Sequence, residues 1–119
     1  MSKDDRSSVI HLMEAQARIP GPAGEHATTA LHRGTLDVAL SIPPSPIQQT
    51  PHAQDEIYIV VRGRAVVLHD GKRESCEAGD IVFVAAGVEH QFEELSDSFA
   101  VWRVFYGPDG GEISTLVHR

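Results

Sequence analysis

One predicted strand has a row of polar side chains on a single face, and these are the residues of the chain best suited to catalysis or metal binding. Because successive side chains of a strand alternate between its two faces, residues of even number between positions 50 and 58 would share one face of a regular strand. Burying such groups is costly unless a metal ion or hydrogen bonds satisfy them, and an imidazole beside a carboxylate is a suitable ligand pair for a divalent first-row metal. The row consists of Thr50, His52, Gln54, Glu56 and Tyr58.

A second histidine lies downstream, after a predicted glycine turn. His90 follows Gly87 by three positions, and Phe92 comes two positions later. His90 and Phe92 have the same parity, so we expect His90 to face inward as the phenylalanine does. His52 and His90 are also compatible with a simpler role, as core histidines satisfied by hydrogen bonds without a metal.

The first 24 residues differ in character from the rest. Apolar residues recur at helical spacing between Ser8 and Arg18, and Ser7 or Ser8 is a suitable N-cap. The proline and glycine residues at positions 20–24 then stop any helix. We therefore predict an N-terminal arm over residues 1–24 with one short helix, followed by a β-barrel domain over residues 25–119.

From Glu25 onward, short strand-like segments alternate with turns. The strongest strand signal runs from Gln48 to Val61, where both faces are largely apolar. Asp70-Gly71 is a favoured two-residue hairpin turn. Short strands at this spacing, separated by glycine turns, indicate an all-β sandwich or barrel. The other predicted strands cover residues 28–32, 35–42, 64–69, 72–77, 81–85, 89–93 and 99–106.

Two segments resemble the motifs of the cupin superfamily, G-x5-H-x-H-x3,4-E-x6-G and G-x5-P-x-G-x2-H-x3-N. Residues 50–63 read TPHAQDEIYIVVRG and fall in register with the first motif at His52, Glu56 and Gly63. Residues 79–94 read GDIVFVAAGVEHQFEE and fall in register with the second at Gly79, Gly87 and His90. The resemblance implies the double-stranded β-helix, or jelly-roll, barrel of the cupins, with a metal ion held inside its mouth.

The first motif lacks one of its usual ligands, because Thr50 stands where the first motif histidine is expected. Framework positions also differ, with Pro44, Ala85 and Glu94 in place of a glycine, a proline and an asparagine. The resemblance therefore implies a metal set of two histidines and one carboxylate: His52, Glu56 and His90. Such a set resembles the facial triad of non-haem iron oxygenases and suits one divalent transition metal, such as iron, zinc, nickel or manganese. The residues expected to line the pocket beside it are Thr50, Gln54, Tyr58 and Phe92.

Composition excludes several kinds of partner and location. The chain has 119 residues and a formal net charge of −7, which argues against nucleic acid because a phosphate backbone requires a basic face. No apolar run approaches the ~20 residues that span a bilayer, and the N-terminus lacks the apolar core of a signal peptide. The single cysteine, Cys76, rules out an intramolecular disulfide and fits a cytoplasmic protein.

Two classes of function fit these expectations. The first is an enzyme, a metal-dependent dioxygenase, isomerase or lyase acting on a small molecule. The second is a non-catalytic module that binds a small ligand or a sugar on the same barrel. The fold does not choose between them, since function depends on the site. We also predict a two-fold homodimer formed through the N-terminal arm and the last strand, with Val101, Trp102 and Phe105 as contributors.

Overall fold

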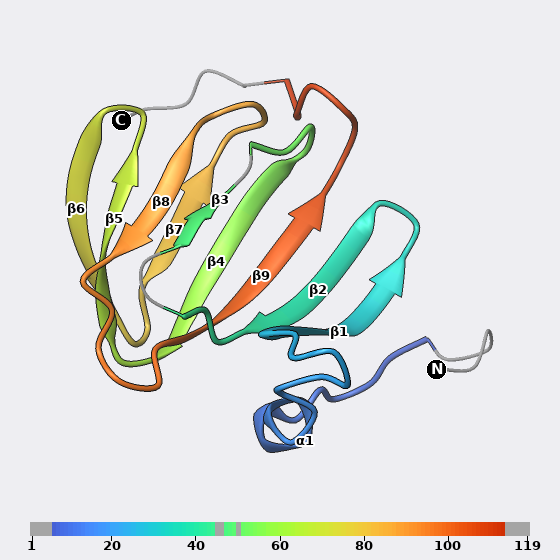
Figure 1. The fold of residues 1–119 in the computed structure, drawn as a ribbon. Coiled ribbons are helices and arrows are strands. Elements are labelled where there is room, and N and C mark those ends of the chain that lie inside the picture. Colours follow the sequence, from blue (N-terminus) through green and yellow to red (C-terminus); the bar gives the residue numbers. More distant parts are fainter. Residues whose placement is uncertain (1–5, 45–46, 50, 114–119) are drawn as a thin grey trace.

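The computed structural model describes residues 6–44, 47–49 and 51–113, and Figure 1 shows the arrangement of its elements. These ranges contain one short helix and nine strands, so the predicted all-β fold is confirmed. In chain order the elements are α1 (Leu12–Gln16), β1 (Ala27–Arg33), β2 (Leu36–Ser41), β3 (Ile47–Gln49), β4 (Asp55–Arg62), β5 (Arg64–His69), β6 (Lys72–Glu77), β7 (Ile81–Val84), β8 (His90–Glu93) and β9 (Ala100–Tyr106).

The strands form two antiparallel sheets. One sheet has five strands in the order β1-β2-β9-β4-β7, and the other has four in the order β3-β8-β5-β6. Consecutive strands lie in different sheets except for the pairs β1-β2 and β5-β6, as expected of a jelly-roll barrel. The core between the sheets is made of Tyr58, Val60, Ala65, Val67, Cys76, Val82, Val84, Phe92, Phe99 and Val101.

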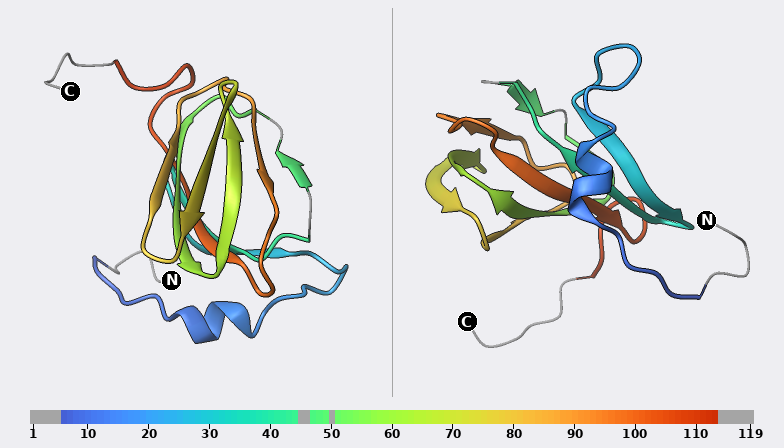
Figure 2. Two further views of the ribbon diagram at one scale, coloured as in Figure 1. Left: turned by 90° about the vertical axis from the view of Figure 1, so that its left-hand side faces the viewer. Right: turned by 90° about the horizontal axis from the view of Figure 1, so that it is seen from below.

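Two strands extend the five-stranded sheet beyond its partner. β1 pairs with β2, and β2 pairs with β9. In Figures 1 and 2 these two strands lie to one side of the four-stranded sheet. The inner face of β1 and β2 is therefore not covered by the four-stranded sheet.

Helix α1 is shorter than expected. The sequence predicts helical structure between Ser8 and Arg18, but α1 covers only Leu12–Gln16, and His11 occupies the N-cap position without a side-chain capping bond. Ala15 packs against Leu40 and Ala100, at the end of the five-stranded sheet where β2 ends and β9 begins (Figure 2). The helix thus covers the outer side of the barrel near Arg62, at the end of β4 that is distant from Glu56.

The predicted strand from Gln48 to Val61 is wrong in one respect, because it is two strands in different sheets. β3 ends at Gln49, and β4 begins at Asp55. Residues 51–54 form an irregular connection that starts at Pro51, a residue without a backbone N–H for a strand ladder. The alternation of faces therefore holds for Glu56 and Tyr58, but it does not extend back to His52 and Gln54.

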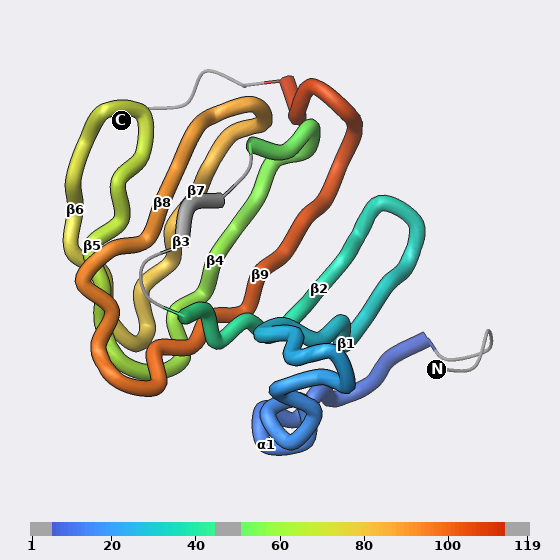
Figure 3. Tube along the Cα trace, viewed as in Figure 1, coloured from blue at the N-terminus to red at the C-terminus, as the bar shows by residue number. Residues whose placement is uncertain are grey.

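Both turns that flank β5 contain an expected glycine, but the turn between β5 and β6 alone closes a hairpin, because β4 and β5 lie in different sheets. Asp70 and Gly71 both have positive φ, +48° and +77°, as a two-residue hairpin turn requires. Gly63, which closes the first motif, has φ +79°, and a Cβ there would clash with the Ser96 hydroxyl and approach the Cα of Phe99 to 3.2 Å. Both turns can be followed in the trace of Figure 3.

Within the described ranges, α1 is too short to cross a bilayer, and no other helix is long and apolar enough to do so. Cys76 is buried in the core with a free thiol.

Candidate functional site

The buried polar residues of the barrel interior come from two strands in different sheets. Glu56 and Tyr58 lie on β4, and His90 is the first residue of β8. Their exposed fractions are 1%, 2% and 3%. Nε2 of His90 lies 3.0 Å from the hydroxyl oxygen of Tyr58 and 3.1 Å from Oε1 of Glu56. The structure therefore brings together two of the three predicted metal ligands and one predicted pocket residue.

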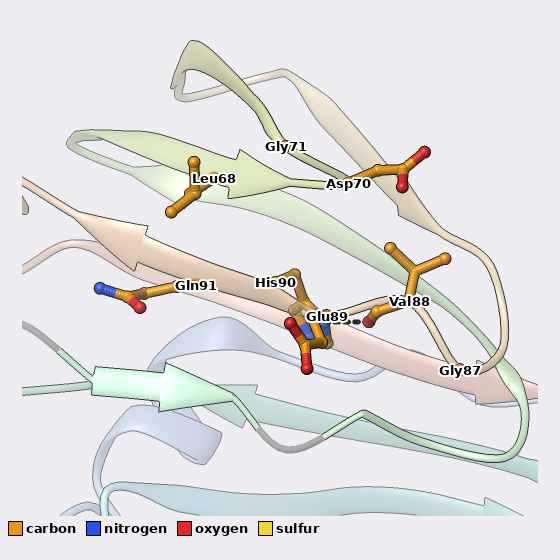
Figure 4. A pocket seen from close by; sticks show the side chains of 8 residues that line it. All are labelled: Leu68, Asp70, Gly71, Gly87, Val88, Glu89, His90 and Gln91. Carbon is orange, nitrogen blue, oxygen red and sulfur yellow. Dashed lines mark hydrogen bonds between the residues drawn. The ribbon is translucent and has the colours of Figure 1, made fainter.

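The orientation of the His90 ring is fixed from outside the site. Its Nδ1 lies 3.0 Å from the backbone carbonyl oxygen of Val88, as Figure 4 shows. A carbonyl oxygen can only accept, so Nδ1 carries a proton and donates it. In the neutral imidazole, Nε2 is then the acceptor, and it points toward Glu56 and Tyr58.

Tyr58 supplies a proton to this group. Burial raises the pKa of the Tyr58 phenol well above its usual value, the charge of Glu56 raises it further, and the charge of Arg103 opposes the shift. The phenol therefore stays protonated and donates to Nε2 of neutral His90. Its ring meets the edge of Phe92 in a T-shaped contact with centroids 4.9 Å apart, so Phe92 supports Tyr58 from the core side.

Glu56 is the least satisfied residue of the interior. Neither of its carboxylate oxygens has a hydrogen-bond partner of acceptable geometry, although Nε2 of His90 is within ion-pair distance. Burial lowers the pKa of His90, but the adjacent Glu56 carboxylate and the Val88 carbonyl together outweigh it and raise that pKa. The pair therefore attracts a positive charge, either a proton on His90 or another cation.

His52 lies beside this group without joining it. Its ring centroid is 6.5 Å from that of His90 and 4.5 Å from that of Phe105. The backbone holds it near the second motif, because the N–H of Gly87 donates to the His52 carbonyl at 2.8 Å. Among the described residues, no three His, Cys, Asp or Glu side chains are close enough to hold a metal together.

Two other predicted pocket residues have different places. Gln54 donates its side-chain amide to the carbonyls of Thr35, at 3.1 Å, and Gly107, at 2.9 Å. It therefore links loops at the rim, and it also lines a hollow on the inner face of the five-stranded sheet. Thr50 lies outside the described residues.

Asp55 is a structural residue of the site that sequence reasoning missed. Its side chain is almost fully buried, and it accepts hydrogen bonds from the N–H of Ala86 at 3.0 Å and of Glu112 at 2.9 Å. It thereby ties the start of β4 to the turn that leads to His90 and to the segment after β9. The residues around Asp55 in the sequence give no indication of these contacts, because both partners are distant in sequence.

The hollow drawn in Figure 4 reaches the interior group at His90, which is one of its lining residues. It has a volume of about 490 Å³ and is bordered by residues of β5, β8 and the adjoining turns. Leu68 and Gln91 are cross-strand partners in its wall, and they alternate with Val67 and Phe92, which are in the core. The hollow therefore lies on the outer side of the four-stranded sheet, while the His90 ring is buried.

The donor atoms around Glu56 fit a divalent first-row cation. A carboxylate with two unpaired oxygens and an imidazole nitrogen are ligands that such metals accept. An imidazole whose second nitrogen donates to a backbone carbonyl has the outer contact typical of a metal-bound histidine. The orphaned oxygens of Glu56 are the observation that supports this fit.

An antiparallel jelly-roll barrel with a glutamate and a histidine meeting in its interior, one from each sheet, is the architecture of a cupin. The chain belongs to the cupin family: the family model for the Cupin domain (Cupin_2) matches residues 40–106. That range contains Glu56, Tyr58 and His90, together with both motifs.

Individual proteins agree with this assignment. The chain is 39% identical over 80 residues to an uncharacterized protein of Streptomyces coelicolor, and the match covers 67% of each chain. It is similar in structure to a Cupin 2 conserved barrel domain protein from Salinispora arenicola, with a TM-score of 0.58, 24% identity and coverage of 68% and 74% of the two chains. A second structural neighbour is the DMSP lyase DddQ from Ruegeria pomeroyi, with a TM-score of 0.59, 21% identity and coverage of 68% and 46%.

Proposed function

We propose that this cupin holds one divalent transition metal on His52, Glu56 and His90 and binds a small molecule beside it. The observation that carries the proposal is the Glu56 carboxylate, which is 1% exposed and has no hydrogen-bond donor on either oxygen. Burying an unpaired carboxylate is strongly unfavourable. A cation bound between Glu56 and His90 relieves that cost, and iron, zinc, nickel and manganese all accept this donor set.

When bound, the metal supplies a Lewis acid or a place for oxygen to bind. The protein groups around it do the rest. The Val88 carbonyl holds the His90 ring in one orientation, and Gly87 holds the backbone of His52. The phenol of Tyr58 keeps its proton and is placed to donate it to an oxygen of a bound molecule when His90 engages another partner.

The reaction class stays open between a dioxygenase, an isomerase and a lyase. One structural neighbour is named as a DMSP lyase, and the likeness at 21% identity concerns the fold. In the described part of this chain, the polar residues close to Glu56 are the proposed ligands, Tyr58 and Arg103. The phenol stays protonated and a guanidinium does not deprotonate, so neither can serve as a base. An enzyme on this site would therefore depend on the metal for activation of its substrate.

The test is the metal content of untagged protein purified without added metal. We expect close to one equivalent of a first-row metal in the wild type, and loss of most of it in Glu56→Gln and His90→Gln. His32→Gln is the matched control, because His32 is exposed and pairs with Asp37. Metal retention by the first two variants equal to that of the wild type would contradict the proposal.

A second candidate function rests on a specific observation, the lack of a three-ligand cluster in the described ranges. In this alternative, Tyr58, His90 and Glu56 form a hydrogen-bonding set that recognises a neutral small ligand, such as a sugar, without metal or chemistry. Wild-type protein that is free of metal, and whose melting temperature does not respond to added metal, would favour this alternative.

We also propose that the protein is a cytoplasmic homodimer. The free, buried Cys76 supports a reducing location. Ile81 and Phe83 on the outer side of β7 are 67% and 53% exposed, which supports association through that face.

A further inference from the structure

A second hollow opens on the inner face of the five-stranded sheet, next to the Glu56 group. It has a volume of about 510 Å³, and its wall includes Thr29, Asp37, Arg103 and Phe105. These residues belong to β1, β2 and β9, where the sheet extends beyond the four-stranded sheet (Figure 1). The hollow therefore has room for a small organic molecule and is open to solvent.

The strand register connects this hollow to the candidate metal site. Arg103 is the direct cross-strand partner of Tyr58, and Phe105 is the direct partner of Glu56. Directly paired residues of antiparallel strands project on the same face, with Cβ atoms about 4.5–5.5 Å apart. A molecule that contacts Arg103 in the hollow thus lies beside the phenol of Tyr58 and close to the carboxylate of Glu56, both on the neighbouring strand β4.

Arg103 has a positive charge that the described residues leave without an acidic partner. Its Nε is buried without a hydrogen-bond acceptor. Its guanidinium carbon lies over the ring of Phe105, 5.2 Å from the ring centroid. A guanidinium does not deprotonate in proteins, so Arg103 keeps its unpaired Nε–H donor at every pH. A bound anion would supply it.

We propose that Arg103 is an anion subsite that takes the carboxylate of a small organic acid, whose other end lies toward Glu56, Tyr58 and His90. The proposal rests on the proposed function insofar as it names the ligand class of that site. A guanidinium matches a carboxylate with two parallel N–H donors, and Nε is one of the donors in that fork. Thr29 adds a hydroxyl to the same wall.

The charges around the hollow favour a carboxylate over a phosphate. Arg103 supplies one positive charge, while Asp37 and Asp109 lie in the same wall and Glu56 lies one residue spacing away. A monoanion neutralises the guanidinium. A dianionic phosphate would leave a surplus negative charge next to three carboxylates, in a chain that already has a net charge of −7.

The test observes Arg103 directly in the full-length protein, stripped of metal and dialysed. The Nε–H signal of Arg103 in a nitrogen–proton NMR spectrum is assigned by its loss in Arg103→Gln. Benzoate is then titrated, with benzamide as a neutral molecule of the same shape and inorganic phosphate as a competing anion. We expect a saturable shift with benzoate, and at least about tenfold weaker binding of benzamide, the size of effect expected from losing a charge-assisted hydrogen bond.

Variants separate binding from folding. Arg103→Gln should abolish the saturable response of neighbouring backbone amides to benzoate, and Arg103→Lys, which keeps the charge without the fork, should retain part of it. Arg64→Gln is the matched control, because Arg64 is the exposed first residue of β5 and does not line the hollow, and this variant should respond as the wild type does. Equal binding of benzamide, an unchanged response in Arg103→Gln, or stronger binding of phosphate than of benzoate would each overturn the proposal.

Metal-free protein keeps this test distinct from that of the metal site. A benzoate response of the stripped protein, combined with no metal in the protein as purified, would leave the subsite standing and overturn the proposed metal function. Metal retention without a benzoate response would overturn the subsite alone.

Discussion

Nε2 of His90 lies 3.1 Å from Oε1 of Glu56, with both side chains almost completely buried. In the metal-free protein, a proton on His90 is the cation nearest to this carboxylate. Proton and metal therefore compete for the same imidazole nitrogen, and each one stabilises the buried charge of Glu56. The competition leads to two predictions, one for the protein without metal and one for the protein with it.

Without metal, the Glu56–His90 pair should stabilise the protein at low pH and lose that effect as the pH rises. Burial opposes the protonation of His90, but Glu56 and the Val88 carbonyl raise its pKa above the ordinary value of 6.5. A raised pKa in the folded state means that the stabilisation is fully present below pH ~6.5 and is lost as the pH rises through the folded pKa. Urea unfolding of chelated, dialysed protein at pH 6 and pH 9 measures this change.

Glu56→Gln is the matched comparison for that experiment. The amide keeps the shape but removes the charge that raises the His90 pKa. At pH 9 the metal-free variant should be as stable as the wild type or more stable, because the wild type then buries an unpaired carboxylate. At pH 6 this advantage should shrink or reverse. A difference between the two proteins that is the same at both pH values would show that His90 does not titrate against Glu56.

Added metal should raise the melting temperature of the wild type. Metal that binds only the folded state contributes ~2.7 kcal/mol at one hundred times its dissociation constant, which for a domain of this size is a shift of about 10 °C. The shift should fade as the pH falls through the histidine range, since the ligands must be deprotonated. Thermal melts with zinc or nickel and with chelator, at pH 8 and pH 5.5, check this.

Glu56→Gln again serves as the control for the metal effect, together with His32→Gln. The first variant should lose most of the metal-dependent shift, and the second should keep it. A chelator that leaves the wild-type melting temperature unchanged would favour the non-metal alternative.

Asp55→Ala should destabilise the protein although Asp55 is neither a proposed ligand nor a residue of the apolar core. The change removes the acceptor of two backbone N–H groups, those of Ala86 and Glu112. Hydrogen bonds to a charged group contribute roughly 1.5–3 kcal/mol each, so we expect the loss of both to lower the free energy of unfolding by about 3–6 kcal/mol. Asp97→Ala, at an exposed turn, should change it by less than about 0.5 kcal/mol. Urea denaturation of both variants measures the difference, and equal effects would contradict the role assigned to Asp55.

The sequence predicted best where local chemistry determines the structure. Strands β5 and β6 match their predicted bounds because Asp70-Gly71 specifies a turn that fixes their register. Glu56 and His90 were brought together by the motif resemblance, and the structure places them 3.1 Å apart. The predicted placement of His52 on the same strand as Glu56 is wrong, because a connection separates β3 from β4.

The contacts that the sequence could not predict are long-range ones. The partners of Asp55 lie 31 and 57 positions away, and no local pattern encodes them. Arg103 had a signal that was overlooked: it is a charged residue at the same parity as Val101 and Phe105 on an otherwise apolar strand. Only the register of β9 against β4 shows that this charge projects beside Tyr58.

The last prediction concerns the surface through which two copies associate. Of the expected contributors, Val101 is in the core, Trp102 is partly buried against the cluster that contains Ala15, and Phe105 is partly buried beside His52. Alternation along β7 instead exposes Ile81 and Phe83 while Val82 and Val84 are buried. We expect sedimentation equilibrium to give a dimer mass for the wild type at micromolar concentration, and a monomer mass for the double variant Ile81→Ser, Phe83→Ser. Met13→Ser, which removes an exposed apolar side chain of α1, is the control and should remain a dimer. If Met13→Ser dissociates and the β7 variant does not, the N-terminal arm forms the interface, and a wild type that sediments as a monomer would refute the homodimer altogether.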